Sequence, residues 1–120
     1  MENKNIVDEL NACAYECTRC YEACLIEKNQ PEVLMCMMLS KNCEEICRLT
    51  VQVIERHSQS AARFLKLCSE ICADCAAECG KHQYEHCLHC AEVCTKSADV
   101  FREVLKHVIA DKQKRSLPVR

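Results

Sequence analysis

The stretch that decides the fold reads CSEICADCAAEC, from Cys68 to Cys79, and spaces its cysteines four, three and four residues apart. The same spacing recurs in CAYECTRCYEAC, from Cys13 to Cys24. Intervals of three and four residues repeat one face of an α-helix, so each stretch predicts a helix whose thiols form a single stripe. Charged residues between the thiols, Glu16 among them, are predicted to face outward.

Two further segments carry the same stripe in shorter form, each with a serine at one step of the register. Their members are Cys36, Ser40, Cys43 and Cys47 in one, and Cys87, Cys90, Cys94 and Ser97 in the other. Residues spaced alternately three and four positions apart line the face that a helix turns toward the core of a bundle. The spacing therefore predicts that all fourteen cysteines point into one interior.

The breaks between these segments are short and carry signals for helix ends. Pro31 suits the first turn of a helix, Ser58 and Ser60 are candidate N-caps, and Gly80 suits a C-cap with a left-handed backbone. The predicted helices cover residues 6–27, 31–57, 61–79 and 83–112.

Four helices of this length with short connections predict an all-α fold, an antiparallel up-down-up-down four-helix bundle with a cysteine-lined core. Residues 1–112 are predicted to form this single domain. Residues 113–120 are predicted to be a basic, flexible C-terminal tail.

The amino-acid composition excludes several classes of function. Cysteine makes up about 12% of the chain (14 of 120 residues), above the ~8–10% typical of cysteine frameworks in short chains. One glycine and two prolines are too few for a loop-rich disulfide scaffold, and a net charge of −2 argues against a nucleic-acid partner. The sequence shows neither a signal peptide nor a run of ~18 apolar residues, so we expect a cytoplasmic protein without a membrane partner.

Several chemistries are compatible with a column of thiols. Cysteine can serve as a small buried hydrophobe. Disulfides within a helix are disfavoured, because Cβ atoms four residues apart lie about 6 Å apart and a disulfide needs about 3.8 Å, while a reducing cytosol disfavours cross-helix bridges. An iron–sulfur electron-transfer protein is a further alternative, since Cys13, Cys17 and Cys20 imitate a cluster-binding spacing. A zinc-binding or redox-sensing module is another.

Copper(I) suits the pattern best, because it accepts two or three thiolates and each monovalent ion offsets one negative charge in a dry core. A Cys-x3-Cys pair can clamp one ion between its sulfurs. Six such pairs are present: Cys13/Cys17, Cys20/Cys24, Cys43/Cys47, Cys68/Cys72, Cys75/Cys79 and Cys90/Cys94. The sequence therefore favours several copper(I) ions per chain over a single cofactor, and no enzymatic activity is expected.

The predicted topology gives the bundle two unlike ends. One end, which we call the mouth, gathers Cys24, Cys36, Cys79 and Cys87, flanked by Met35, Met37, Met38, His82, His86 and His89. Thioether and imidazole are weaker copper ligands than thiolate, which suits a site that hands ions inward. The other end, the apolar plug, comprises Ile6, Leu10, Val51, Ile54, Phe64, Leu65, Phe101, Leu105 and Val108.

These motifs resemble a known family, the four-helix-bundle copper storage proteins of the cytosolic bacterial type. The likeness covers about residues 6 to 100, and its most specific stretches are CSEICADCAAECGKH (68–82), HCLHCAEVC (86–94) and CMMLSKNCEEIC (36–47). The resemblance implies storage of many copper(I) ions and assembly as a homotetramer. It implies these metal ligands: Cys13, Cys17, Cys20, Cys24, Cys36, Cys43, Cys47, Cys68, Cys72, Cys75, Cys79, Cys87, Cys90 and Cys94, with His82 and His86 at the mouth.

The sequence departs from better-stocked members of that family near the plug. Ile6, Leu10, Ser97 and Phe101 occupy positions where such members can carry further cysteines. A smaller capacity is therefore expected, with copper confined to the mouth-side two thirds of the bundle.

Overall fold

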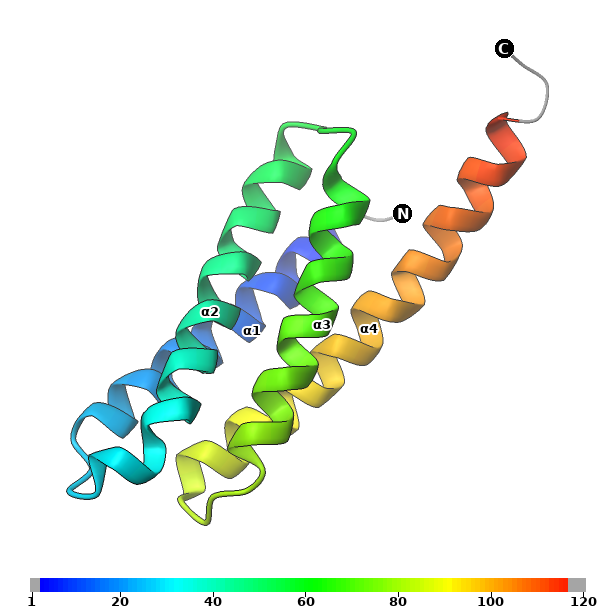
Figure 1. Cartoon of the computed structure of the whole chain (residues 1–120). Coiled ribbons are helices and arrows are strands. Elements are labelled where there is room, and N and C mark those ends of the chain that lie inside the picture. Colours follow the sequence, from blue (N-terminus) through cyan, green and yellow to red (C-terminus); the bar gives the residue numbers. More distant parts are fainter. Residues whose placement is uncertain (1–2, 117–120) are drawn as a thin grey trace.

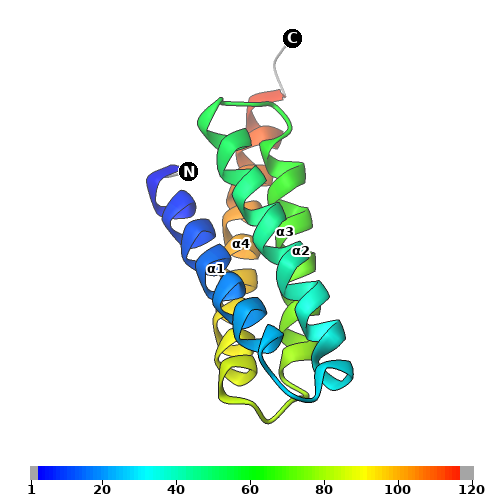
Figure 2. The same ribbon diagram turned by 90° about the vertical axis from the view of Figure 1, so that its left-hand side faces the viewer.

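The structure, a computed structural model, describes the backbone of residues 3–116 and the side chains of residues 5–108. Four α-helices make up this part of the chain: α1 (Asn3–Leu25), α2 (Gln30–Glu55), α3 (Ala61–Cys79) and α4 (Glu85–Ser116). They run side by side in alternating directions, with the α1–α2 and α3–α4 connections at one end and the α2–α3 connection at the other (Figures 1 and 2). The predicted all-α four-helix bundle is confirmed.

The helix limits follow the sequence signals closely. α3 has the predicted limits, and Pro31 lies in the first turn of α2. α4 continues past the predicted end at Lys112 to Ser116, beyond the α2–α3 connection (Figure 1). The rest of the predicted tail, 117–120, lies outside the described residues. None of the described helices combines enough length and hydropathy to cross a lipid bilayer.

The prediction of a left-handed Gly80 is wrong. Gly80 has φ −68° and ψ −13°, a right-handed conformation. α3 ends instead in a tightened turn, in which the N–H groups of Lys81 and His82 donate to the carbonyls of Glu78 and Cys79 at 3.1 and 3.2 Å. Because these bonds satisfy the last carbonyls of α3, its end requires no left-handed residue.

The left-handed residue lies at the end of α2, where His57 has φ 54°. Its N–H donates to the Ile54 carbonyl at 2.9 Å, and the Ser58 N–H donates to the Val53 carbonyl at 3.2 Å. These two bonds form a Schellman motif, which more often places glycine at this position. Ser60 is the N-cap of α3, but its side chain makes no capping bond.

The core has a thiol half and an apolar half. In the apolar plug, Ile6, Leu10, Leu65 and Phe101 are at most 2% exposed, and Phe64 is half-buried. Ordinary hydrophobic burial at this end stabilises the bundle independently of metal.

One predicted outward residue is buried. Glu16 on α1 is only 8% exposed, because the half-exposed imidazole of His89 on α4 lies over it. The His89 Nδ1 and Glu16 Oε2 atoms are 2.7 Å apart. This pair joins α1 to α4.

Candidate metal centre

All fourteen cysteines are free and have no exposed surface. Their register follows from the alternating spacing, which brings each thiol back to the inner face of its helix. The predicted cysteine-lined core is therefore confirmed. What the structure adds is which thiol lies opposite which.

Because α2 and α3 pack antiparallel, each inner residue of α2 faces one inner residue of α3. We call each facing pair a rung, and the series of pairs a ladder. The mouth rung joins Cys36 and Cys79, whose sulfurs are 2.8 Å apart. The next rung sets the Ser40 hydroxyl 3.6 Å from Cys75 Sγ. The third joins Cys43 and Cys72, with 3.2 Å between the sulfurs. Each step along α2 away from the mouth is matched by an equal step back along α3.

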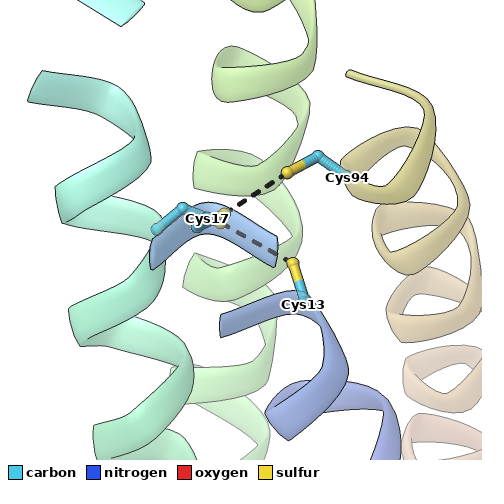
Figure 3. Close-up of side chains that lie close together, drawn as sticks. Cys13, Cys17 and Cys94 are labelled. Atoms are coloured by element: carbon cyan, nitrogen blue, oxygen red, sulfur yellow. Dashed lines mark hydrogen bonds between the residues drawn. The ribbon is translucent and has the colours of Figure 1, made fainter. Parts of the chain in front are cut away.

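A second ladder joins α1 to α4. Its rungs include Cys24 with Cys87, at 3.9 Å, and Cys17 with Cys94, at 3.6 Å between sulfurs. Figure 3 shows Cys13 and Cys17 of α1 and Cys94 of α4 turning their sulfurs toward one another.

Short contacts also connect the two ladders. Cys13 lies 3.8 Å from Cys43 and 3.6 Å from Cys72, and Cys36 lies 3.6 Å from Cys87, measured between sulfurs. The thiols therefore form one continuous column through the bundle.

Within the described residues, five groups bring three or four ligand atoms within 4.8 Å of one another. The groups are Cys13/Cys17/Cys43/Cys94, Cys13/Cys43/Cys47/Cys72, Cys17/Cys75/Cys90/Cys94, Cys20/Cys79/Cys90 and Cys20/Cys24/His86/Cys87. Because several cysteines belong to two groups, ions bound in neighbouring groups would share thiolates. Such sharing suits a cluster of soft monovalent ions better than separate closed sites.

His86 belongs to the group at the mouth. Its Nδ1 lies 3.5 Å from Cys87 Sγ and 3.8 Å from Cys24 Sγ. Its Nε2 lies 2.9 Å from a carboxylate oxygen of Glu27, and its ring stacks on Tyr84 with centroids 5.6 Å apart. A carboxylate on one ring nitrogen leaves the other free to face a metal, an arrangement common around metal-binding histidines.

Glu27 and Tyr84 were not predicted as part of the site. Glu27 follows α1 in the α1–α2 connection, and Tyr84 immediately precedes α4. Glu27 comes three residues after Cys24 and so continues the register of the first cysteine stripe, which is a signal in the sequence. Tyr84 has no place in the alternating register that runs from Cys87 to Ser97. Only the meeting of the two connections at one end of the bundle brings them to His86.

The structure places His82 elsewhere at the mouth. Its Nε2 lies 3.0 Å from a carboxylate oxygen of Glu78, and none of the ligand groups found among the described residues includes it. Met37 is buried, whereas Met35 and Met38 are each about half exposed.

The thiols at the mouth and next to it differ in acidity. Hydrogen bonds from the Cys36 and Cys79 thiols lower the pKa of Cys20 below its usual range. Burial raises the pKa of Cys87 to about 11, and the negative charge of Cys20 adds to this effect. Burial opposes the charged form of His86, but hydrogen bonds with Cys20 and Glu27 raise its pKa overall. A charged Cys20 beside a protonated Cys87 limits the negative charge held at this end of the core.

The Thr50 hydroxyl lies beside Cys68, at the end of the thiol column farthest from the mouth. The Thr50 hydroxyl donates to the Ile46 carbonyl at 2.7 Å, and Cys68 Sγ lies 3.0 Å from the same hydroxyl oxygen. Cys68 belongs to none of the ligand groups among the described residues. The apolar plug begins beyond this point.

Known proteins share both this sequence pattern and this fold. The family described as "Copper storage protein" matches residues 1–106. A cysteine-rich protein of Bacillus subtilis, YhjQ, is 35% identical over 92 residues, which cover 77% of this chain and 85% of YhjQ.

Two solved copper storage proteins resemble the whole bundle. Cu(I)-bound BsCsp3, the copper storage protein 3 of Bacillus subtilis, is 31% identical, with a TM-score of 0.81 over 86% of this chain and 97% of its own. A cytosolic copper storage protein of Streptomyces lividans, loaded with five coppers, is also 31% identical, with a TM-score of 0.82 over 87% of this chain and 92% of its own. These likenesses support copper storage and give no support to the iron–sulfur or zinc alternatives. The chain belongs to the copper storage protein family.

Proposed function

We propose that this protein stores copper(I) as a cluster of ions held by the core thiolates. The observation that carries the proposal is the set of overlapping thiol groups, whose sulfurs are fully buried and lie within 4.8 Å of one another. The proposed ligands are the fourteen cysteines together with His86, and His82 as an outer ligand at the mouth.

Charge balance favours copper(I) over a divalent ion in this core. A zinc ion with four thiolates leaves two uncompensated negative charges, and a buried charge without a partner is costly. Copper(I) ions that share bridging thiolates can instead match the negative charges one for one.

The proposed loading route runs from the mouth inward. His86 is partly exposed and reaches three thiols of the outermost ligand group, so it can take up an ion at the surface and pass it inward. The apolar plug offers no ligand at the opposite end. Its aliphatic and aromatic side chains would have to part before an ion could pass.

We also propose a cellular location, a role without catalysis and an oligomeric state. We place the protein in the cytoplasm, in a storage role without catalysis, as a homotetramer. The location is supported by the cytosolic relative from Streptomyces lividans, and the absence of catalysis by the storage role of the family. The homotetramer rests on the family resemblance alone.

Titration of the reduced, metal-free protein with copper(I) tests the function. In competition with a chromophoric chelator, we expect on the order of ten ions per chain, from roughly one ion for every one or two thiolates. The loaded protein should stay colourless in the visible range, whereas an iron–sulfur cluster would be brown. Saturation at one or two ions would contradict storage.

The two mouth histidines should differ in their effect on uptake. His86→Ala is expected to slow uptake from a chelated copper(I) donor about tenfold or more, because it removes the partly exposed ligand of the outermost group. His82→Ala should slow uptake less, by about twofold, because its imidazole lies beside Glu78 and belongs to none of the ligand groups among the described residues. Stopped-flow absorbance of the donor complex measures both. Equal rates for the two variants would contradict a role for His86 in loading.

A further inference from the structure

Cys36 and Cys79 at the mouth lie closer together than any other thiol pair among the described residues. Their sulfurs are 2.8 Å apart, and the next closest pair, Cys43 and Cys72, is separated by 3.2 Å. The remaining sulfur–sulfur contacts are 3.6–3.9 Å long. Cys36 is also absent from the ligand groups described above.

This separation is closer to that of a disulfide than to that of two ligands of one metal ion. Two sulfurs that share a tetrahedral ion, each about 2.3 Å from it, lie about 3.8 Å apart. A disulfide has its sulfurs about 2.05 Å apart. Cys36 and Cys79 would therefore have to separate by about 1 Å to share an ion, and to approach by less than 1 Å to bond.

Their position in the fold also favours a bond. The geometric objection to disulfides in this chain concerns cysteines four residues apart on one helix, whereas this pair bridges α2 and α3. Cys79 is the last residue of α3, followed by Gly80, so the backbone on one side of the pair lies outside regular helix. The neighbouring rung cannot form a disulfide, because it pairs Cys75 with the hydroxyl of Ser40.

We propose that Cys36 and Cys79 are an oxidative modification site, which forms a reversible disulfide between α2 and α3 when the cell's small disulfides accumulate. The bond removes the Cys79 thiolate from the Cys20/Cys79/Cys90 ligand group, so copper held by that group is released until the bond is reduced. The copper part of this inference rests on the proposed function, while the disulfide itself does not.

The chemistry needs only a small-molecule disulfide of the glutathione type as oxidant. One cysteine thiolate attacks it, which forms a mixed disulfide and releases one small thiol. The second cysteine thiolate then attacks the protein sulfur of that mixed disulfide and releases the other small thiol. The two cysteines lose two electrons and two protons in total, and the small disulfide is reduced to two thiols. Both sulfurs are buried, so the reaction requires opening of the mouth.

Mapping the first disulfide to form tests the site in metal-free protein. The reduced full chain is treated anaerobically with glutathione disulfide, and the remaining thiols are alkylated at intervals. Cleavage after lysine, arginine and glutamate isolates Cys36 in residues 33–41 and Cys79 in residues 79–81, which mass spectrometry can identify as a linked pair. We expect this linked pair to form about tenfold faster than any other. Two of the 14 thiols should be lost to alkylation, and dithiothreitol should restore both.

Matched variants make the test specific. Cys36→Ser should abolish the linked pair, whereas Cys87→Ser, which alters a neighbouring mouth thiol 3.6 Å from Cys36, should leave it intact. A first link elsewhere, a random mixture of links, or fourteen thiols still open to alkylation after treatment would each overturn the proposal.

Release of copper from the loaded protein tests whether the disulfide weakens copper binding. Glutathione disulfide should release copper to a chromophoric chelator at least several-fold faster from the wild type than from Cys36→Ser, because only the wild type can form the bond. Equal release from both would overturn the link to copper. A protein that takes up no copper but still forms the bond would contradict the proposed function and leave the modification site standing.

Discussion

Phe101→Ala is expected to lower the free energy of unfolding of the metal-free protein by about 3–5 kcal/mol. Phe101 is fully buried in the apolar plug, in one cluster with Leu10, Leu65 and Leu105. Loss of its ring removes apolar burial and leaves a cavity that the helices fill only in part. The effect is a large share of the total, since small domains are stable by about 5–15 kcal/mol.

The only other phenylalanine of the chain provides the control. Phe64 is half-buried and is not one of the side chains packed against the cluster that contains Phe101, so Phe64→Ala should cost less, about 1–2 kcal/mol. Urea unfolding followed by circular dichroism under reducing conditions measures both variants. Similar losses for the two would mean that the plug is not the stabilising core of the metal-free bundle.

Copper(I) loading is expected to raise the midpoint of thermal unfolding by at least about 20 °C. An ion present at 1,000 times its dissociation constant stabilises the folded state by about 4 kcal/mol, and several ions act together. The thiols of an unfolded chain are no longer held together as ligand groups, so bound copper favours the bundle. Differential scanning calorimetry of metal-free and loaded protein measures the shift.

Removal of the copper and a substitution in the apolar plug serve as the two controls for the calorimetry. Extraction with excess copper(I) chelator should return the midpoint to the metal-free value. Loaded Phe101→Ala should gain at least as much as loaded wild type, because its substitution lies outside the thiol groups. A shift of only a few degrees with about ten ions bound would show that the thiol column binds copper equally well without the fold.

The fold and the inward direction of the thiols could be predicted because both follow from helical periodicity. A spacing of three and four residues places Cys13, Cys17, Cys20 and Cys24 on one face whatever the partner helices are. Short connections then leave few ways to pack four such helices. For the same reason the location of the apolar plug could be predicted.

Contacts between distant parts of the chain could not be predicted in this way. Glu27 meets His86 across 59 residues, and Glu16 meets His89 across 73. Such pairs depend on how far each helix is rotated and shifted against its neighbour, which no single helix encodes. The error at Gly80 is local but similar, since the hydrogen bonds of the following turn decide the conformation at the end of α3.

A thiol column that is closed at one end has a consequence for the order in which its ions exchange. In the proposed route, ions that enter through the mouth and move toward Thr50 are followed by later arrivals, and the apolar plug closes the other end. Under the proposed route the store then works on a last-in, first-out basis. Recently acquired copper turns over quickly near His86, while the deepest ions remain as a long-lived reserve.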